Sequence, residues 1–409
     1  MSVKTRRSFA FVTPRFGRDI AGGAETLVAS LARQLVRRGD HVEIFTTCAK
    51  NNTSWSNDFP AGRCDEDGLV VRRFEIDERD TDVWIEHQIA ISEGLRLSLE
   101  AQLDWMQNGV NSTALYTALE VEADRFEAIF LAPYLFGTTF FGALVRPDKS
   151  ILIPCLHDEH YAYLEIVESM FRQVKGALFN AAPEQELAER LYGHVAGGPV
   201  GMGFEGYSDE HLQGIKPYFK DNFPYLLYLG RKETGKGVQT LLDYFLELKA
   251  NCEEASPLKL VICGGGDFAN LHRPEALGNP DIIDLHQITE AEKRSLVRHA
   301  ACLVQPSVNE SFSIVIMEAW LLNVPVLVNA ACAVTRTHVL DSGGGLYFDS
   351  SEDFARVVME LVQNQSMREK LALAGKSYVE REYNWEAVLK RFDEVLAGLT
   401  PKVPGGIIC

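Results

Sequence analysis

The chain has 409 residues, of which 46% are hydrophobic and 24% charged, and its formal net charge is −17. This length is too great for one ordinary hydrophobic core, so two domains are expected. The acidic balance argues against nucleic acid as a partner, because phosphate binding needs a cationic surface.

The first half begins with the pattern of a parallel α/β domain. An apolar run at 8–16 ends in Pro and Gly, helical periodicity follows over 25–38, and an apolar strand returns at 41–46. Strand, glycine loop, helix and strand in this order predict a βαβ unit. Residues 83–107 are predicted to form an amphipathic helical insertion. Further strands are predicted at 68–76, 126–136, 150–159 and 175–184.

Basic residues cluster in sequence near the start of this domain. A solvated strand-and-helix edge explains them, and a basic face towards anionic lipid or an anionic acceptor is the alternative. The cluster consists of Lys4, Arg6, Arg7, Arg15, Arg18, Arg33, Arg37 and Arg38.

The same pattern restarts after a Gly-rich and polar stretch at 197–223, which is the best linker candidate. Two successive doubly wound units predict two Rossmann-like domains, 1–203 and 204–383, facing a central cleft. A last helix, about 384–399, is expected to pack back on the first domain. The second domain is predicted to have strands at 224–230, 258–265, 281–286, 302–307, 324–329 and 343–348, and helices at 237–252, 289–300, 313–322, 351–363 and about 366–382.

The eight cysteines show no C-x-x-C pair and no Cys/His cluster with zinc-like spacing. Several lie inside apolar runs, where a cysteine serves as a small buried hydrophobe. Reduced thiols and a cytoplasmic location are therefore expected. The sequence contains no signal-peptide pattern and no apolar run of about 20 residues, and the terminal "GGIIC" is not a prenylation box.

Two carboxylates, Glu310 and Glu318, lie eight positions apart in the apolar run "PSVNESFSIVIMEAWLLNVPVLVN". The helix that starts near Ser311 or Ser313, either of which can cap it, would present its first backbone N–H groups as an anion site. Glu318 would lie about 12 Å along that helix. A carboxylate beside a phosphate site suits sugar hydroxyls better than the phosphate. The plainer alternative is a helix-dipole Glu310 and a surface Glu318 paired with a cation.

Three glycine-containing loops could also approach a ligand. In "GRKETGKG", Arg231 and Lys236 follow a strand and are separated by a turn, which suits clamping a diphosphate, although a charged surface turn is equally compatible. The loop "AGGAE", with Gly22 and Gly23, joins the first strand to its helix, and Gly264 and Gly265 follow the strand "LVIC". Both lack the G-x-G-x-x-G spacing of a dinucleotide site.

The run "PCLHDEH" places His157, Asp158 and Glu159 at the end of a strand. Successive residues of a strand diverge, so a metal site is not favoured. His157 is expected to reach a substrate hydroxyl or to be a capped core histidine. Asp80 and Asp82, in a charged loop, are a weak candidate for holding a metal-bound diphosphate.

Taken together, these segments resemble glycosyltransferase family 4, a retaining group with the GT-B fold. The resemblance runs in chain order through "GGAE", "HDE", "FNAAPEQELAERLYG", "GRKETGKG", "LVICGGGD" and the E-x7-E motif from Glu310 to Glu318. Asp158 and Glu159 depart from the family pattern, which often has a small residue after the histidine, so their roles stay open. The insertion at 83–107 lies outside the common core.

The resemblance implies a role for each matching residue. Arg231 and Lys236 would hold the diphosphate, Glu310 the donor sugar and Glu318 the ribose hydroxyls. His157 would contact the sugar near its 6-hydroxyl, and Gly22 and Gly23 would approach the phosphate. The amides around the start of the helix would assist, and Gly264 and Gly265 would contribute backbone to the same donor site. The helix-start residues are Ser311, Phe312, Ser313, Ile314 and Val315.

The activity implied by the resemblance is retaining transfer of a hexose from a UDP-sugar to a saccharide or lipid-linked saccharide in bacterial polysaccharide or glycolipid synthesis. UDP-glucose is the first expectation and UDP-N-acetylglucosamine the second, with no metal or other cofactor. The family is thought to react on one face of the sugar, with the leaving diphosphate accepting the proton. A cytoplasmic enzyme with peripheral contact at the inner membrane fits the composition. The alternatives are a sugar-nucleotide epimerase, a non-catalytic sugar-nucleotide-binding protein and, less favoured, an oxidoreductase.

Overall fold

The computed structural model describes residues 6–20, 22–276 and 278–399, which form two compact units. Unit 1 contains the described residues up to Gly203 and those from Val388 onward, and unit 2 runs from Phe204 to Ala387. Unit 1 is therefore built from both ends of the described chain, whereas unit 2 is one continuous segment. Lys4 and the terminal Cys409, which the sequence analysis considered, lie outside the described residues.

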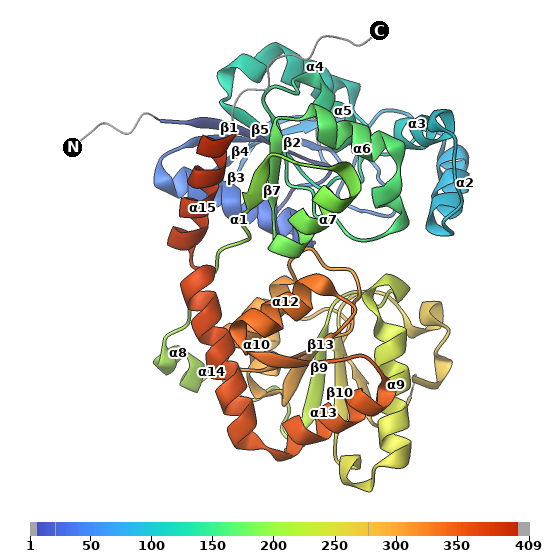
Figure 1. The fold of residues 1–409 in the computed structure, drawn as a ribbon, viewed down its shortest axis with the longest axis vertical. Helices are drawn as coiled ribbons and strands as arrows, with labels where there is room; N and C mark the ends of the chain where they lie inside the picture. Colours follow the sequence, from blue (N-terminus) through green and yellow to red (C-terminus); the bar gives the residue numbers. More distant parts are fainter. Residues whose placement is uncertain (1–5, 21, 277, 400–409) are drawn as a thin grey trace, which may run out of the picture. The chain divides into compact units, whose positions relative to one another are not determined.

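Unit 1 is an α/β unit around an eight-stranded sheet of order β3-β4-β2-β1-β5-β6-β7-β8, in which β3 alone is antiparallel to its neighbour (Figure 1). Its strands are β1 (Ser8–Thr13), β2 (His41–Thr47), β3 (Gly62–Glu66), β4 (Leu69–Phe74), β5 (Ala128–Leu131), β6 (Ser150–Leu152), β7 (Gly176–Phe179) and β8 (Gly197–Pro199). Its helices are α1 (Gly23–Arg38), α2 (Thr81–Ser92), α3 (Leu99–Gln107), α4 (Thr113–Glu122), α5 (Gly137–Val145), α6 (Glu165–Gln173), α7 (Ala182–Tyr192) and most of α15 (Trp385–Gly398).

Helix α1 illustrates how the sequence sets local structure. Leu27, Leu31 and Leu35 recur at helical spacing and are buried, so one face of the helix packs on the sheet. Gly39 ends the helix in the left-handed conformation, with φ of 103°, and its N–H bonds the carbonyls of the last turn. The chain then enters β2, which pairs with β1 in parallel.

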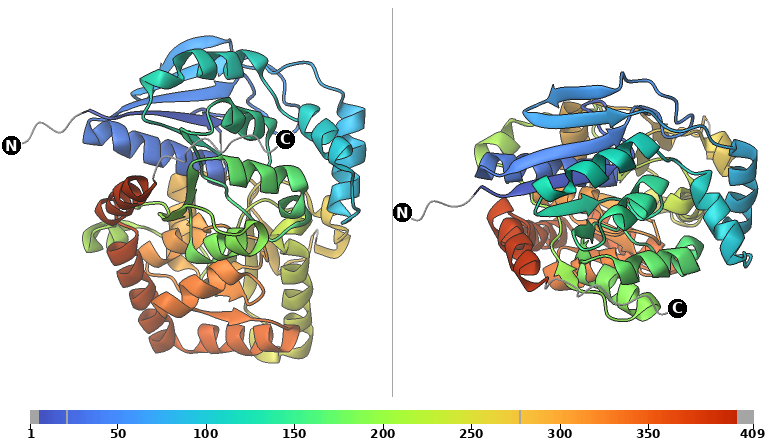
Figure 2. Two further views of the ribbon diagram at one scale, coloured as in Figure 1. Left: turned by 45° about the horizontal axis from the view of Figure 1, so that its top comes forward. Right: turned by 90° about the horizontal axis from the view of Figure 1, so that it is seen from above.

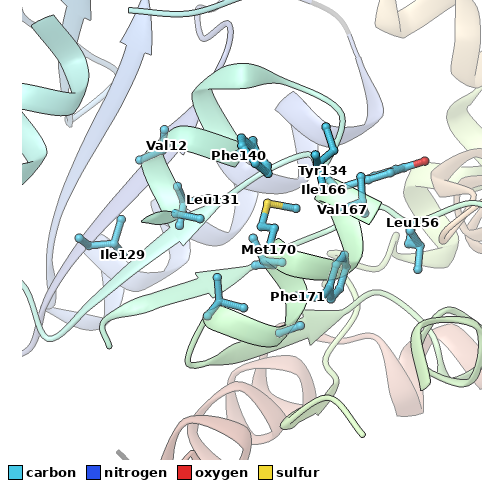
Figure 3. Close-up of a cluster of buried hydrophobic side chains, with 14 of the residues drawn as sticks. Val12, Ile129, Leu131, Tyr134, Phe140, Leu156, Ile166, Val167, Met170 and Phe171 are labelled. Carbon is cyan, nitrogen blue, oxygen red and sulfur yellow. The ribbon is translucent and has the colours of Figure 1, made fainter. Parts of the chain in front are cut away.

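The core of unit 1 lies between the sheet and helices α4 to α7. Figure 3 shows part of it, where Met170 and Phe171 of α6 lie beside Leu131 of β5 and Phe140 of α5. Helix α15 packs on another part of the sheet through Phe392, which is fully buried against Phe9 and Phe130 with ring centroids 5.8 and 5.5 Å away. The C-terminal helix is thus a structural part of unit 1.

Unit 2 contains a six-stranded parallel sheet of order β11-β10-β9-β12-β13-β14. This is the doubly wound order of a dinucleotide-binding fold. Its strands are β9 (Tyr225–Leu229), β10 (Lys259–Cys263), β11 (Ile282–Asp284), β12 (Cys302–Gln305), β13 (Val326–Asn329) and β14 (Gly345–Phe348). Its helices are α8 (Asp209–Gly214), α9 (Val238–Asn251), α10 (Glu290–His299), α11 (Ile314–Leu321), α12 (Ala333–Ser342), α13 (Ser351–Gln363) and α14 (Gln365–Glu382).

Helix α14 packs closely on α11 at Trp320. A side chain at Gly375 would overlap the Trp320 ring, and Trp320 Nε1 donates to the Gly344 carbonyl at 2.7 Å. Close approach of this kind requires glycine at the contact. Helix α11, which carries Glu318, is therefore held in place by its contact with α14.

The structure confirms the α/β prediction and the main strands, but it differs in detail. The insertion at 83–107 is two helices, α2 and α3, because the chain turns at Gly94, which has a φ of 75° (Figure 2). Helices α4 to α8 and α12, and the antiparallel edge strand β3, were not predicted. The patterns of these elements are short, and they lie beside strongly apolar runs that periodicity assigns to strands. In the described part of the chain, no helix is both long and apolar enough to cross a membrane.

Candidate functional site

The order of the second sheet determines where its ligand site lies. Connections leave β9 and β12 towards opposite sides, and ligands of such sheets bind beyond the carboxyl ends of the strands at this switch point. The loop after β9 carries Arg231 and Lys236, and the loop after β12 carries Glu310. The fold therefore brings two motifs, 74 residues apart at Lys236 and Glu310, to one edge of the sheet.

Gly237 fixes these two loops against each other. It has a φ of 70°, and a Cβ there would overlap the carbonyl oxygen of Pro306 in the loop after β12. Any larger residue would have to separate the loops and adopt a strained backbone. Close approach at Gly237 positions Lys236, its neighbour, beside Glu310.

Lys236 and Glu310 form an ion pair, with Nζ 2.8 Å from Oε1. The Glu310 side chain is 12% exposed and that of Lys236 is 28% exposed, so the pair is partly buried and open to solvent on the lysine side. The two residues expected to contact sugar and diphosphate thus contact each other in the free protein. The positive charge of Lys236 would offset the repulsion between the Glu310 carboxylate and a phosphate bound nearby.

Arg231 lies on the surface and pairs with Glu233 at 2.8 Å. The next residue, Lys232, is buried, and its ammonium donates to the Gly264 carbonyl and to Asp284 Oδ1, both at 2.9 Å. The sequence analysis did not single out Lys232. Its only signal was a second cation beside Arg231, and its partners come from the loop after β10 and from β11.

The glycines after β10 serve this same packing. A side chain at Gly264, with a φ of 138°, would overlap the carbonyl oxygen of Gly230, whereas one at Gly265 would meet open space. The Gly265 carbonyl accepts the Lys232 amide at 2.7 Å. Gly264 therefore allows the loops after β9 and β10 to approach each other, and the space where a side chain of residue 265 would lie is empty of protein atoms.

Helix α11 begins at Ile314, and the residue before it is Ser313. Ser313, one of the two serines considered as a possible cap, adopts a left-handed conformation with a φ of 68° and makes no side-chain cap. Its Oγ instead accepts from Gln305 Nε2 at 3.3 Å. The first amides of the helix, those of Ile314 and Val315, have no carbonyl one turn earlier to bond.

Phe312, next to the half-buried Ser311, anchors this loop in an aromatic cluster. Its ring lies 5.5 Å from His338, 5.1 Å from Tyr383 and 6.2 Å from Phe204. Burial lowers the pKa of His338 to about 3, and its Nδ1 is 3.0 Å from the Tyr378 hydroxyl. The neutral, buried His338 therefore packs against Phe312 and helps to hold the loop before α11 in place.

Glu318 lies in the second turn of α11 and pairs with Lys293 of α10 at 2.8 Å. Burial raises the pKa of Glu318, against the opposing effect of Lys293. A carboxylate held in this way can still offer its second oxygen to a pair of hydroxyls. Lys293 was missed because it lies 25 residues earlier, on a helix of otherwise ordinary charge pattern.

In unit 1, Gly22 precedes α1 and Gly23 is its first residue. A side chain at Gly22 would overlap the carboxylate of Glu25, which pairs with Arg15 at 2.5 Å, whereas Gly23 has open space. The Glu25 carboxylate thus already lies beside the start of α1. Gly23 leaves room for a ligand at this helix start.

His157 lies beyond β6 with its Nδ1 3.6 Å from Glu159 Oε1. Glu159 also accepts from the Tyr134 hydroxyl at 2.9 Å, while Asp158 contacts Tyr163 and Arg190, both at 2.6 Å. Asp158 and Glu159 therefore have different partners. They are not at a strand end, because β6 stops at Leu152 and the predicted strand at 150–159 was too long. Because Nδ1 of His157 faces Glu159, its Nε2 is the ring nitrogen that a ligand could contact.

A buried carboxylate, Glu184 of α7, holds the His157 loop. Its Oε1 accepts the Leu156 amide at 2.6 Å and its Oε2 the Asn180 amide at 2.5 Å. Burial raises the pKa of Glu184 to about 8, although both amides oppose the shift. In the sequence, Glu184 is recognisable only as a glutamate in the first turn of a helix.

The basic N-terminal cluster is largely neutralised. Its paired members are Arg7 with Glu127 and Asp393, Arg15 with Glu25, Arg18 and Arg33 with Asp67, and Arg38 with Asp40 and Asp393. These ion pairs agree with a charged edge of the sheet. Within 6–20, 22–276 and 278–399, no group of three or more His, Cys, Asp or Glu side chains could hold a metal ion.

Comparison with known proteins places this site in context. Residues 214–378 match the family model of glycosyl transferases group 1. A D-inositol 3-phosphate glycosyltransferase from a Nocardioides species is 30% identical over 39% of this chain and 38% of its own length. The same-named protein of Paenarthrobacter aurescens is 23% identical over 94% of this chain and 95% of its own. Alignments with the first three such relatives cover only 38% to 42% of their length.

Two solved structures resemble nearly the whole chain. Sucrose-phosphate synthase from Thermosynechococcus elongatus has a TM-score of 0.69 at 16% identity, covering 96% of this chain and 99% of its own. Anabaena HepE, solved in complex with UDP and glucose, has a TM-score of 0.66 at 14% identity, covering 95% and 99%. The chain therefore has the GT-B fold, and together with the family match this supports a glycosyltransferase.

Proposed function

We propose that the chain is a retaining, metal-independent hexosyltransferase of family 4 that takes its sugar from a UDP-sugar, with UDP-glucose as the first candidate and UDP-N-acetylglucosamine as the second. The observation that carries the proposal is the Lys236–Glu310 pair at the switch point of the second sheet. A cation and a carboxylate side by side match a donor that presents a diphosphate next to sugar hydroxyls.

The donor is proposed from the site and from the relatives together. HepE was solved with UDP and glucose, and an Escherichia coli structure of the same fold is described as bound with UDP-2-fluoro glucose. In this chain, Glu318 would hold the ribose hydroxyls with the oxygen that Lys293 leaves free. Glu310 would turn from Lys236 to the hydroxyls of the sugar.

The chemistry requires stabilisation of the departing diphosphate. Lys236 would move from Glu310 to the phosphate, Arg231 would leave its surface partner Glu233 to join it, and the first amides of α11 would donate to the same oxygens. In a same-face reaction, the leaving phosphate accepts the proton of the acceptor hydroxyl, so neither Glu310 nor Glu318 acts as a nucleophile. Retention is checked by NMR of the anomeric configuration of the product.

The acceptor is proposed to be a saccharide or a lipid-linked saccharide, used by a cytoplasmic enzyme in peripheral contact with the inner membrane. His157, held by Glu159, would contact the donor sugar near its 6-hydroxyl. An epimerase with the same architecture is the second candidate. It would convert the sugar nucleotide without any acceptor, which separates the two.

A panel of sugar nucleotides tests the donor. Each is incubated with the enzyme alone, and release of the nucleoside diphosphate and any change in the sugar are measured, alongside the thermal shift that each ligand produces. We expect UDP-glucose to give the largest shift and slow hydrolysis with EDTA present. Conversion to an epimer would support the second candidate, and no shift with any sugar nucleotide would contradict both.

Lys236→Ala tests the central residue. We expect turnover to fall by about 100-fold or more, as when a group that stabilises transition-state charge is removed, while the unfolding midpoint changes little. Lys390→Ala, which removes an exposed lysine of α15 in unit 1, is the matched control and should leave turnover unchanged. Near-normal turnover of Lys236→Ala would exclude the proposed role.

A further inference from the structure

A polar cavity lies in unit 1, away from the residues of the proposed donor site. It has a volume of about 290 Å³ and is lined by residues of β2, β3 and β4 and of the end of α4. We call it the arginine pocket. It is lined by Glu43, Gly62, Arg63, Arg72, Arg73, Phe74, Glu122 and Arg125.

The charges in the arginine pocket do not balance. Arg72 pairs with Glu122 at 2.7 Å, and Arg125 pairs with Glu43 at 2.7 Å, so two guanidinium groups use both carboxylates. The Arg73 guanidinium bonds elsewhere, to the Phe16 carbonyl and to Glu66, with which it forms an ion pair. Arg63 is a third cation, and it has no ion-pair partner among the described residues.

The strand register makes this excess unusual. Arg63 of β3 lies directly opposite Arg72 of β4 in the antiparallel pair. Like charges at directly opposed positions destabilise a sheet. An edge strand gains protection from an outward charge, but this protection does not need a second arginine opposite the first. An anion between the two guanidinium groups would remove the repulsion.

The pocket also holds an unsatisfied acceptor. Glu43 is 1% exposed, and its Oε2 has no hydrogen-bond partner, although its Oε1 contacts Arg125 and His41. The Oε2 atom has a long ion-pair contact with Arg72, at 3.8 Å, but no hydrogen bond. A buried carboxylate oxygen without a hydrogen-bond donor is costly, and such groups usually have one. A hydroxyl or amino group of a ligand would supply the missing donor.

We infer that the arginine pocket binds a small oxyanion that also carries hydroxyl groups. Its phosphate or carboxylate would lie between Arg63 and Arg72, in the fork geometry that guanidinium favours. One of its hydroxyls would donate to Glu43 Oε2. The volume is at the lower limit of small-molecule sites, so the ligand has the size of a short phosphorylated polyol and is smaller than a nucleotide.

Calorimetric titration of the full chain tests this inference, with glycerol 3-phosphate, inorganic phosphate and glycerol as probes. We expect glycerol 3-phosphate to bind more tightly than inorganic phosphate, and glycerol to give no signal. Arg63→Gln should weaken binding of glycerol 3-phosphate by about tenfold. Arg172→Gln, which removes an arginine of α6 that is 66% exposed in the same unit, is the control and should leave binding unchanged.

Two further measurements locate the binding. Saturating UDP should leave the affinity for glycerol 3-phosphate unchanged, and displacement by UDP would assign the binding to the donor site and overturn the inference. Glu43→Gln should reduce the preference for glycerol 3-phosphate over inorganic phosphate. If Glu43→Gln does not fold, the Arg63→Gln variant on the exposed edge strand still tests the inference. Equal affinities of wild type and Arg63→Gln for glycerol 3-phosphate, or no binding of it at millimolar concentration, would overturn the inference.

Discussion

Each glutamate of the E-x7-E pair has a lysine partner in the free protein. Glu310 pairs with Lys236 from the neighbouring loop, and Glu318 pairs with Lys293 from α10. For Glu318, a surface residue paired with a cation was the alternative to a ribose-binding role. The ion pair with Lys293 is present, and the second carboxylate oxygen of Glu318 is the group proposed to bind ribose.

Conservative substitutions separate the two glutamates. Glu318→Gln should weaken UDP binding by about tenfold, because an amide offers the ribose hydroxyls a poorer acceptor than a carboxylate. Glu310→Gln should lower kcat by about tenfold or more and leave the Kd of UDP within about twofold. Calorimetry with UDP and initial rates measure these effects. Unchanged values in both variants would leave the two residues with structural ion pairs alone.

His338 gives the pH dependence of stability a predictable sign. Its pKa is about 3 in the folded protein because it is buried, whereas in the unfolded chain it is near 6.5. Between these values the unfolded state binds the extra proton, so the contribution of His338 to stability is present above pH 6.5 and is lost as the pH falls towards 3. The loss is at most about 1.4 kcal/mol per pH unit.

His338→Phe should therefore flatten the fall in urea stability between pH 7 and pH 5. The difference between variant and wild type isolates His338, since Glu184 and the other groups titrate in both proteins. A raised pKa, as at Glu184, acts in the other direction: stability from the bound proton is lost as the pH rises from about 4.5 to about 8. Parallel pH profiles for wild type and His338→Phe would contradict the prediction.

At the scale of elements, the loop after β9 and the loop after β12 depend on one contact. Gly237 has a left-handed backbone and lies against Pro306, and its position at the start of α9 fixes where Lys236 lies. Neither motif alone defines this geometry. It follows from the doubly wound strand order, which makes β9 and β12 neighbours.

Gly237→Ala should cost about 1–3 kcal/mol of unfolding free energy, because the new side chain is strained and overlaps Pro306. Turnover should fall as well, since Lys236 is displaced. Gly235→Ala, two residues earlier in the same turn, is the control, because a Cβ there meets no atom within 4 Å. Equal effects of the two changes in denaturant titrations would show that the contact is unimportant.

At the scale of the whole molecule, the chain returns to its first unit at the end. Phe392 of α15 is buried against Phe9 and Phe130, and Asp393 pairs with Arg7 and Arg38. The C-terminal helix therefore stabilises unit 1, although it follows unit 2 in sequence.

Phe392→Ala should destabilise unit 1 by about 3–5 kcal/mol, the usual cost of removing a buried phenylalanine. In calorimetric unfolding, this change should lower the transition of unit 1, and UDP should raise the transition of unit 2, which contains Glu318. Exposed Leu373 of α14 offers a control, because Leu373→Ala removes little buried area. A UDP-sensitive transition that shifts with Phe392→Ala would contradict this division.

The sequence by itself determined the parts of this protein that depend on local pattern. Apolar runs and helical periodicity predicted an α/β fold with two doubly wound halves, and the glycine loops and the two glutamates marked the loops that form the candidate site. These features are readable because strands, helices and turns each impose a short-range preference on the residues that form them.

The tertiary structure alone decided which residues are partners. Lys236 with Glu310, Lys293 with Glu318, the buried Lys232 and Glu184, and the opposed pair Arg63 and Arg72 come from segments separated in sequence or from a strand that periodicity did not reveal. Strand order and register bring these groups together, and burial strengthens the electrostatic interactions between them. Neither strand order nor burial is encoded in a local window of sequence, so the pairings that define both candidate sites could only be found in the folded chain.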